Sequence, residues 1–330
     1  MHMLPETMRA LVINGVTPAD KATISEVVVP KTKEGWLLVR VRGIGLNHSE
    51  QVLRLGEVNE AYIAKPVIPG IECVGEVADP GDTAFRTGQR VCAFMGGMGR
   101  SFDGSYAEYV LAPAHHVFSL PQSADALPWR TLAAMPETFY TTWGSLFQGL
   151  RLSSEDTLLV RGGTCGLGYA ALQIARALGC RTIATTHRES RLARLDELGC
   201  DVSLVDDGNL SDKALGATKV LELVGTSTLR DSLRAVRGGG IVCHTGILGG
   251  GQPLRGFNPI AEIPNGVYLT GFHSNWPDQG SVTAMFDFIA KHSIQPVVAE
   301  TFRFERLLDA IALQDHGGFD GKITVVNEDA

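Results

Sequence analysis

The sequence predicts an α/β protein of two domains, and three observations lead to this prediction. The chain has 330 residues, which is more than a single hydrophobic core usually organises. From residue 8 to about residue 121, short runs of β-branched and aromatic residues alternate with Gly and Pro, which favours an irregular β domain. After Pro128, apolar strands alternate with helical patterns. This alternation is typical of a doubly wound domain, a parallel sheet with helices on both faces.

The expected elements follow the chain in this order. The β region contains candidate strands at residues 9–13, 36–41, 75–77, 90–94 and 107–111. The second region contains candidate strands at residues 158–160, 181–184, 219–223, 240–244 and 268–272, with helices expected at 167–178 and 190–198. Beyond Asp278 the pattern returns to a helix at 281–290 and a final strand at 321–326.

Composition excludes several classes of function. Because 29 Lys and Arg stand against 36 Asp and Glu, the net charge of −7 has the wrong sign for a binder of nucleic acid. No apolar run reaches the roughly 18 residues of a membrane span. The six cysteines form no CxxC pair and the N-terminus carries no secretory signal, so we expect a cytoplasmic protein. The His115-His116 pair, if it lies on a strand, points to opposite faces, and we expect no metal site.

The clearest motif is a glycine-rich turn between the strand at 158–160 and the helix after it. It consists of Gly163, Thr164, Cys165, Gly166, Leu167 and Gly168. A strand, a tight turn and a helix N-terminus together form the context that binds the pyrophosphate of a dinucleotide. Cys165 stands where the GxGxxG pattern has its middle glycine, so we expect the pyrophosphate slightly farther from the turn. The alternative is an ordinary glycine turn.

The end of the next strand distinguishes the two nicotinamide cofactors. An acidic residue about 20 positions after the turn would bind the ribose 2′-hydroxyl of NAD. No acid is found there, and the chain instead offers Thr186, His187, Arg188 and Arg191. Each charge-assisted contact with a 2′-phosphate is worth about 1.5–3 kcal/mol, so these residues favour NADPH. The alternative is that both arginines are solvated residues of the next helix.

Several segments resemble, in the same order, motifs of the medium-chain dehydrogenase/reductase superfamily. These segments are residues 45–50, 69–77, 88–91 and 104–109 and the Gly163 turn. The resemblance extends from about residue 9 to residue 326. It implies a discontinuous GroES-like catalytic domain, formed by residues 1–126 and 274–330, with a Rossmann dinucleotide-binding domain inserted at 127–273.

The resemblance also allows the metal positions to be compared. Zinc alcohol dehydrogenases of this superfamily carry a cysteine in a motif similar to residues 43–50 and a histidine in a Gly-His-Glu motif. The matching positions here are Asn47 and Ile71, and residues 95–104 lack the cysteines of the structural-zinc lobe. The chain therefore resembles the zinc-independent quinone oxidoreductase and enoyl reductase branch.

A quinone or conjugated enone accepts hydride at carbon, and the protein must supply a dry slot and a donor near the developing enolate. The resemblance implies that Asn47 lies beside the nicotinamide ribose and the substrate, that Tyr62 faces the substrate as a proton or hydrogen-bond donor, and that Thr141 lies near the nicotinamide. The alternatives are a turn-forming Asn, a packing Tyr and a Thr of a core helix.

Weaker candidates follow the later strands of the second region. Leu223, Val224, Thr245, Gly246 and Ile247 are expected at the carboxyl edge of the parallel sheet, where such sheets bind ligands. The strand at 268–272 commonly pairs with its two-fold mate in this family, so the resemblance implies a homodimer.

The sequence thus indicates an NADPH-dependent, zinc-free reductase of quinones or activated alkenes, with a small-molecule substrate. Two alternatives remain open. One is an enoyl-thioester reductase of a biosynthetic pathway, and the other is a protein that keeps the cofactor fold with little catalysis.

Overall fold

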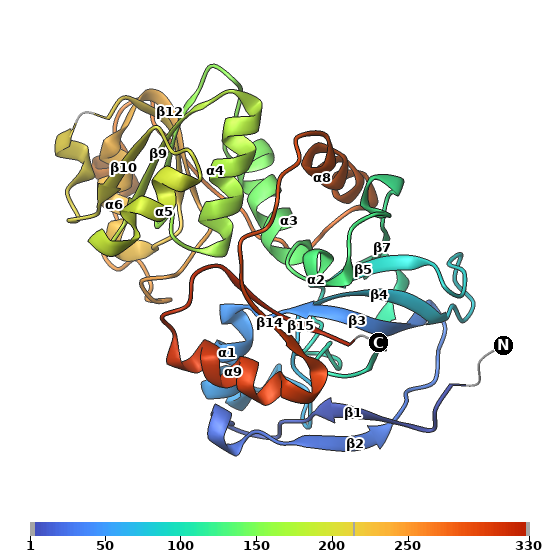
Figure 1. Cartoon of the computed structure of the whole chain (residues 1–330). Coiled ribbons are helices and arrows are strands. Elements are labelled where there is room, and N and C mark those ends of the chain that lie inside the picture. Colours follow the sequence, from blue (N-terminus) through green and yellow to red (C-terminus); the bar gives the residue numbers. More distant parts are fainter. Residues whose placement is uncertain (1–3, 214, 328–330) are drawn as a thin grey trace. The chain divides into compact units, whose positions relative to one another are not determined.

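The computed structural model describes residues 4–213 and 215–327, and the chain divides into two units (Figure 1). Unit 1 extends to Glu137 and also includes Asn275–Lys291 and the chain from Gln295 onward, whereas unit 2 comprises Thr138–Ser274 with His292–Ile294. The division after Glu137 lies beyond the expected boundary at 126/127, because helix α2 (Trp129–Leu132) packs against strands of unit 1. The α/β fold class, with one unit inserted into the other, is confirmed.

Unit 1 is built on a seven-stranded sheet with the order β14-β15-β3-β4-β5-β7, in which β6 also pairs with β3. Its strands are β3 (Trp36–Gly45), β4 (Glu72–Asp79), β5 (Arg90–Phe94), β6 (Tyr109–Pro113), β7 (Val117–Ser119), β14 (Val298–Arg303) and β15 (Lys322–Val326). Strands β1 (Thr7–Leu11) and β2 (Ile24–Val28) form a separate antiparallel pair. Strand β15 pairs with β3 in antiparallel direction. In Figure 1 the red strand β15 therefore lies beside the blue strand β3.

The helices of unit 1 are α1 (His48–Leu55), α2, α8 (Gln279–Lys291) and α9 (Leu307–His316), together with 3-10 turns at Ala19–Lys21, Glu57–Asn59, Ala114–His116, Gln122–Ala124 and Phe304–Arg306. Helix α3 (Pro136–Gly144) begins in unit 1 and continues in unit 2. The apolar core draws on both ends of the chain, since Leu37, Val91 and Ile323 are all buried in one cluster. The GroES-like unit therefore depends on the C-terminal strands.

Unit 2 contains a six-stranded parallel sheet with the order β10-β9-β8-β11-β12-β13. The strands are β8 (Thr157–Arg161), β9 (Arg181–Thr186), β10 (Val202–Val205), β11 (Ala217–Glu222), β12 (Val236–His244) and β13 (Tyr268–Gly271). Counted along this unit the order is 3-2-1-4-5-6, which is the Rossmann arrangement. The order reverses between β8 and β11, and a ligand crevice is expected at the carboxyl ends of these two strands.

Helices α4 (Gly166–Leu178) and α5 (Leu192–Glu197) pack beside β8, β9 and β10, and α6 (Thr226–Ala235) packs on β11 and β12. The unit also contains α7 (Pro259–Glu262), a π-helical turn at Ser145–Gly149, and 3-10 turns at Glu189–Arg191 and Leu210–Lys213. Among the residues described, no helix combines the length and apolarity that crossing a membrane requires.

Candidate functional site

The glycine-rich turn lies directly after β8, where the strand order of unit 2 reverses. Gly162 has a φ of +82°, which favours glycine. A Cβ on Gly163 would lie 2.9 Å from the Cβ of Ala184 in β9, and a Cβ on Gly168 would overlap the carbonyl oxygen of Gly163. Two glycines of the motif therefore allow β8, β9 and α4 to approach closely, which leaves the N-terminus of α4 facing the turn.

Cys165, at the middle position of the motif, is the N-cap of α4. Its Sγ accepts a hydrogen bond from the backbone N–H of Gly168 at 3.4 Å. Burial raises the pKa of the Cys165 thiol, and the hydrogen bond from Gly168 opposes this shift. The Cys165 side chain thus folds back onto the first turn of α4. Its sulfur satisfies one of the backbone N–H groups that have no partner within the helix.

The residues expected to bind a 2′-phosphate gather around this turn. The hydroxyls of Thr164 and Thr186 lie 3.1 Å apart, and Thr186 Oγ1 accepts from the N–H of Arg188 at 3.2 Å. Arg191 Nη1 donates to the carbonyl oxygen of Thr164 at 3.2 Å. Arg188 Nε donates to His187 Nε2 at 3.0 Å, and both of these side chains are exposed. The structure therefore places two hydroxyls and the Arg191 guanidinium together at the carboxyl end of β9, whereas the Arg188 guanidinium contacts the exposed His187.

Sequence reasoning missed Arg161, the last residue of β8, which is fully buried. Its Nε and Nη2 each lie 2.8 Å from the carboxylate of Asp206, and its Nη1 lies 2.7 Å from Asp231. Asp206 follows β10 and its N–H donates to Thr186 O at 2.8 Å. A carboxylate therefore lies close to the end of β9, but it is paired with Arg161. An arginine inside an otherwise apolar strand is the signal that could have revealed this pair.

The loops after β11 and β12 carry the five weaker candidates, Leu223, Val224, Thr245, Gly246 and Ile247. The N–H of Leu248 donates to Leu223 O at 3.0 Å, and the N–H of Thr245 donates to Glu222 O at 3.0 Å. A Cβ on Gly246 would overlap the carbonyl oxygen of Leu223. The two loops are thus bound to each other at the carboxyl edge of the sheet.

Thr141 lies in α3 and is buried. Ser145, which sequence reasoning did not select, joins it to the sheet edge: the Ser145 hydroxyl donates to Thr141 O at 2.7 Å and lies 2.8 Å from Thr245 Oγ1. Ser145 begins the π-helical turn that follows α3, and such turns are frequent at functional sites. Thr141 and Thr245 are therefore linked through one buried hydroxyl.

In unit 1, Asn47 precedes α1 and its N–H donates to Glu50 Oε2 at 2.8 Å. Its amide Nδ2 donates to Glu72 Oε1 at 2.9 Å, and its Oδ1 accepts a hydrogen bond from Lys322 Nζ. Burial raises the pKa of Glu50, while the N–H of Ile71 and the charge of Lys322 oppose this shift. The structure therefore surrounds Asn47 with buried ionisable groups: Glu50 is buried and not a surface neighbour, and sequence reasoning did not select Glu72 and Lys322.

Tyr62 lies in a loop of unit 1 and its side chain is 63% exposed. Its hydroxyl donates to Glu57 Oε1 at 2.8 Å, and this hydrogen bond raises the pKa of Tyr62. Glu57 is paired with Arg100 at 2.7 Å, and Arg100 also donates to Ser49 Oγ at 2.9 Å. A chain of hydrogen bonds thus connects Tyr62 to the first turn of α1, next to Asn47.

The donor set of unit 1 does not match a zinc site. Asn47 Oδ1 already binds an ammonium, and Ile71 is a buried apolar residue. In the ranges 4–213 and 215–327, no group of three or more His, Cys, Asp or Glu side chains is placed to hold a metal ion. His115 and His116 lie in a 3-10 turn rather than on a strand, and their rings are 4.6 Å apart. The expectation that they point to opposite faces was wrong, because the turn brings neighbouring side chains together.

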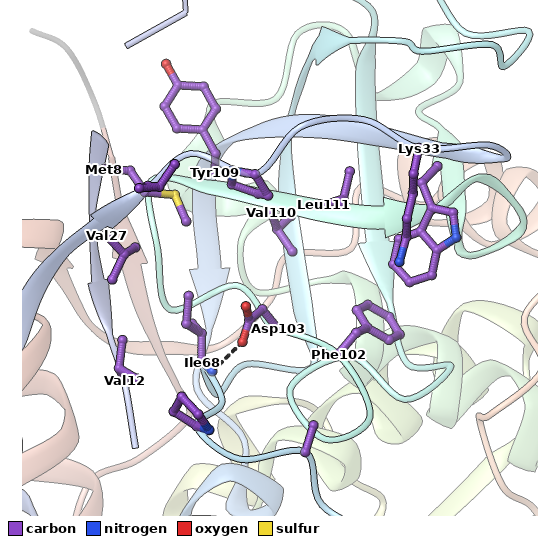
Figure 2. Close-up of a pocket in the computed structure, with 15 residues that line it drawn as sticks. Met8, Val12, Val27, Lys33, Ile68, Phe102, Asp103, Tyr109, Val110 and Leu111 are labelled. Carbon is purple, nitrogen blue, oxygen red and sulfur yellow. Dashed lines mark hydrogen bonds between the residues drawn. The ribbon is translucent and has the colours of Figure 1, made fainter. Parts of the chain in front are cut away.

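A cavity of about 400 Å³ lies elsewhere in unit 1, between the β1–β2 pair and β6 (Figure 2). Figure 2 shows Val12, Ile68, Phe102 and Val110 among its mostly apolar lining. Asp103 in this lining is engaged by the N–H of Ile68 at 2.9 Å. None of the residues predicted for the site lines this cavity.

Comparisons with known proteins agree with this architecture. The model of the alcohol dehydrogenase GroES-like domain matches residues 33–122, and that of the zinc-binding dehydrogenase family matches residues 166–291. Together these matches span more than half of the chain. The chain belongs to the medium-chain dehydrogenase/reductase superfamily.

Relatives within the superfamily span nearly the whole chain. Quinone oxidoreductase of Mus musculus is 29% identical over 321 residues, which cover 92% of each chain. An alcohol dehydrogenase of Geobacillus stearothermophilus is 25% identical and covers 96% of this chain and 98% of its own. The structure of a mycobacterial protein complexed with NADPH superposes with a TM-score of 0.81 at 23% identity, over 97% of this chain and 100% of that chain. This chain is therefore an oxidoreductase, and its family binds nicotinamide cofactors.

Proposed function

We propose that this protein is an NADPH-dependent, zinc-independent reductase that transfers hydride to a quinone or to the β-carbon of an α,β-unsaturated carbonyl compound. The observation that carries the cofactor assignment is the group of Thr164, Thr186, Arg188 and Arg191 around the glycine turn. Two guanidinium groups and two hydroxyls suit a 2′-phosphate, whereas the nearby carboxylate of Asp206 is bound by Arg161 and is not presented to a ribose hydroxyl.

The residues of unit 2 fit such a cofactor. The turn after β8 and the N-terminus of α4 would bind the pyrophosphate, and Thr141 and Thr245, joined by Ser145, would lie at the nicotinamide end. When bound, the reduced nicotinamide supplies two electrons and one proton as hydride, and the acceptor takes up a second proton from a donor of the protein or from water. The hydrogen-bonded loops at the sheet edge would help to orient the cofactor.

Support for the acceptor class comes from unit 1 and from the relatives. Zinc alcohol dehydrogenases have motifs similar to those around Asn47 and Ile71. At these two positions they carry metal ligands, whereas this chain has an amide and an apolar side chain. Proteins named quinone oxidoreductase are among its relatives. In this proposal Asn47 lies beside the acceptor, and the Tyr62 hydroxyl turns from Glu57 Oε1 to donate a hydrogen bond or a proton to the acceptor oxygen. The free thiols at all six cysteines suit a reducing cytoplasm.

Turnover with a panel of acceptors tests this proposal. The oxidation of NADPH and of NADH should be followed with quinones, enones and an enoyl thioester, using protein purified without added metal whose zinc content has been measured. We expect turnover with a quinone or an enone, preference for NADPH, and activity unaffected by chelators. Preference for the enoyl thioester would favour a biosynthetic reductase. Tight NADPH binding without turnover on any acceptor would favour a cofactor-binding protein, and stoichiometric zinc would contradict the metal-free chemistry.

A further inference from the structure

A buried ion pair lies beside Asn47 in unit 1. Lys322 Nζ is 2.8 Å from Glu72 Oε1, and the two residues are 7% and 1% exposed. Asn47 bridges them, because its Oδ1 accepts from Lys322 Nζ and its Nδ2 donates to Glu72 Oε1 at 2.9 Å. The other carboxylate oxygen of Glu72 accepts from the N–H of Glu137 at 2.8 Å. Both oxygens of this buried carboxylate are therefore satisfied.

The backbone is shaped to admit this pair. A Cβ on Gly45 in β3 would lie 2.5 Å from Lys322 Cε and 2.6 Å from Glu72 Oε1, so only glycine leaves room for the two groups. Gly321 precedes Lys322 and has a φ of +110°, and a Cβ there would lie 2.5 Å from Val297 O. Gly45 thus leaves room for the ion pair at the end of β3, and Gly321 lets the chain pass close to Val297 as it enters β15.

The chemistry of the pair determines how the Asn47 amide is oriented. An ammonium only donates hydrogen bonds, so it must face the amide oxygen of Asn47. An ionised carboxylate only accepts, so Glu72 must face the amide nitrogen. A reversed amide would place Nδ2 against Lys322 and Oδ1 against Glu72, which would leave buried polar groups unpaired at a cost of about 1–3 kcal/mol each.

We propose that Lys322 is a positioning residue for the reaction, which fixes the Asn47 amide and holds a positive charge beside it. The inference rests on the proposed function, in which Asn47 lies next to the acceptor. The position of Asn47 is the one at which zinc enzymes of the superfamily have a metal-binding cysteine. Here an ammonium supplied by the last strand and paired with Glu72 lies beside that position, and it holds the Asn47 amide in one orientation toward the acceptor.

The orientation of the amide can be tested without activity. The side-chain NH2 resonances of Asn47 are identified by their loss in Asn47→Asp, and they are then compared in wild type, Lys322→Met, Lys322→Arg and the exposed control Lys291→Met. We expect a changed shift and faster hydrogen exchange in Lys322→Met, with wild-type behaviour in Lys291→Met. Unchanged Asn47 resonances in Lys322→Met would overturn the proposal.

Loss of Lys322 leaves Glu72 as a buried unpaired charge, which can prevent folding. If Lys322→Met does not fold, the double variant Lys322→Met with Glu72→Gln removes both charges and provides the same readout. We expect the Asn47 amide in the double variant to exchange faster than in wild type. An amide that is as protected as in wild type would show that Lys322 does not position it.

Kinetics connect this geometry to the reaction. We expect kcat of Lys322→Met to fall by about tenfold or more while the NADPH dissociation constant changes less than about twofold, because the groups proposed to bind the cofactor phosphates lie in unit 2. In Lys322→Ala, added ethylamine should restore part of the lost kcat. An unchanged kcat in Lys322→Met, in an enzyme whose wild type is active, would overturn the positioning role. Absence of turnover in wild type would instead contradict the proposed function, and the resonances of Asn47 would still decide the role of Lys322.

Discussion

Arg161 and Asp206 form a two-point ion pair in unit 2, with Nε and Nη2 of the guanidinium each 2.8 Å from a carboxylate oxygen. Asp231 completes the arrangement at 2.7 Å from Nη1. Burial by itself would lower the pKa of Arg161, but the hydrogen bonds from Arg161 to Asp206 and the charges of the neighbouring carboxylates raise it overall. Arg161 directly precedes the turn that we propose binds the cofactor, and it engages both carboxylate oxygens of Asp206.

Replacement of Arg161 should strongly destabilise the protein. Arg161→Met leaves two carboxylates without their cation, and breaking a buried pair in this way typically costs about 3–5 kcal/mol. The free energy of unfolding, measured with chemical denaturant, checks this value. Arg306→Met is the matched control, because Arg306 is exposed and its pair with Asp309 should contribute less than about 1 kcal/mol. Equal losses in the two variants would contradict the importance of the buried pair.

Asp231 should make stability depend on pH in the acid range. Burial alone would raise the pKa of Asp231, but hydrogen bonds from Ser211 and Leu210 and the charge of Arg161 lower it overall. Its contribution is therefore complete above the ordinary aspartate pKa and is lost as the pH falls through the lowered folded-state pKa. We expect Asp231→Asn to flatten the loss of stability below about pH 4. Denaturation curves at several acid pH values provide the measurement, and parallel pH profiles for the two proteins would refute this expectation.

The cofactor preference should depend on Arg188 and Arg191, which follow β9. Arg188→Ala and Arg191→Ala should each weaken NADPH binding by about tenfold or more, because each removes a charge-assisted contact with the 2′-phosphate. Binding of NADH should change much less. Fluorescence titration measures both affinities, and Arg181→Ala serves as the control because Arg181 begins β9 at the opposite end of the strand. Equal losses for NADH and NADPH would contradict a 2′-phosphate site.

Cys165 should contribute to stability as a helix cap. Cys165→Ala removes the acceptor for the N–H of Gly168 and should cost about 0.5–2 kcal/mol, whereas Cys165→Ser supplies a preferred N-cap residue and should be at least as stable as wild type. Thermal unfolding compares the three proteins. If Ser and Ala are equally destabilising, the sulfur acts through packing and not as a cap.

The β13 edge of the parallel sheet should mediate the homodimer that the family resemblance implies. Strand β13 lies at this edge and its Tyr268 is 61% exposed. An unprotected edge strand can pair with a two-fold copy of itself. Tyr268→Lys should weaken association, as measured by sedimentation, whereas Val205→Lys on the opposite edge strand β10 should not. A monomeric wild-type protein would contradict the dimer.

Local patterns were sufficient to predict much of unit 2. The alternation of strands and helices, the glycine turn and the absence of an acid after β9 are all properties of short segments, because hydrophobic periodicity and turn chemistry act over neighbouring residues. The edge strands β10 and β14 escaped prediction, since their residues are mostly half-buried or exposed and give a weak apolar signal. The cysteine at the middle of the motif was visible in the sequence, but its capping bond was not.

By itself the sequence determined the α/β class, and it predicted the cofactor turn after β8, the basic end of β9 and, through the family resemblance, the absence of zinc ligands at Asn47 and Ile71. Only the tertiary structure decided which charges surround these positions. Lys322 meets Asn47 across 275 positions of sequence, and Arg161 meets Asp231 across 70. No local pattern encodes such pairs, because a buried charge acquires its partner only when segments that are far apart in the chain come together.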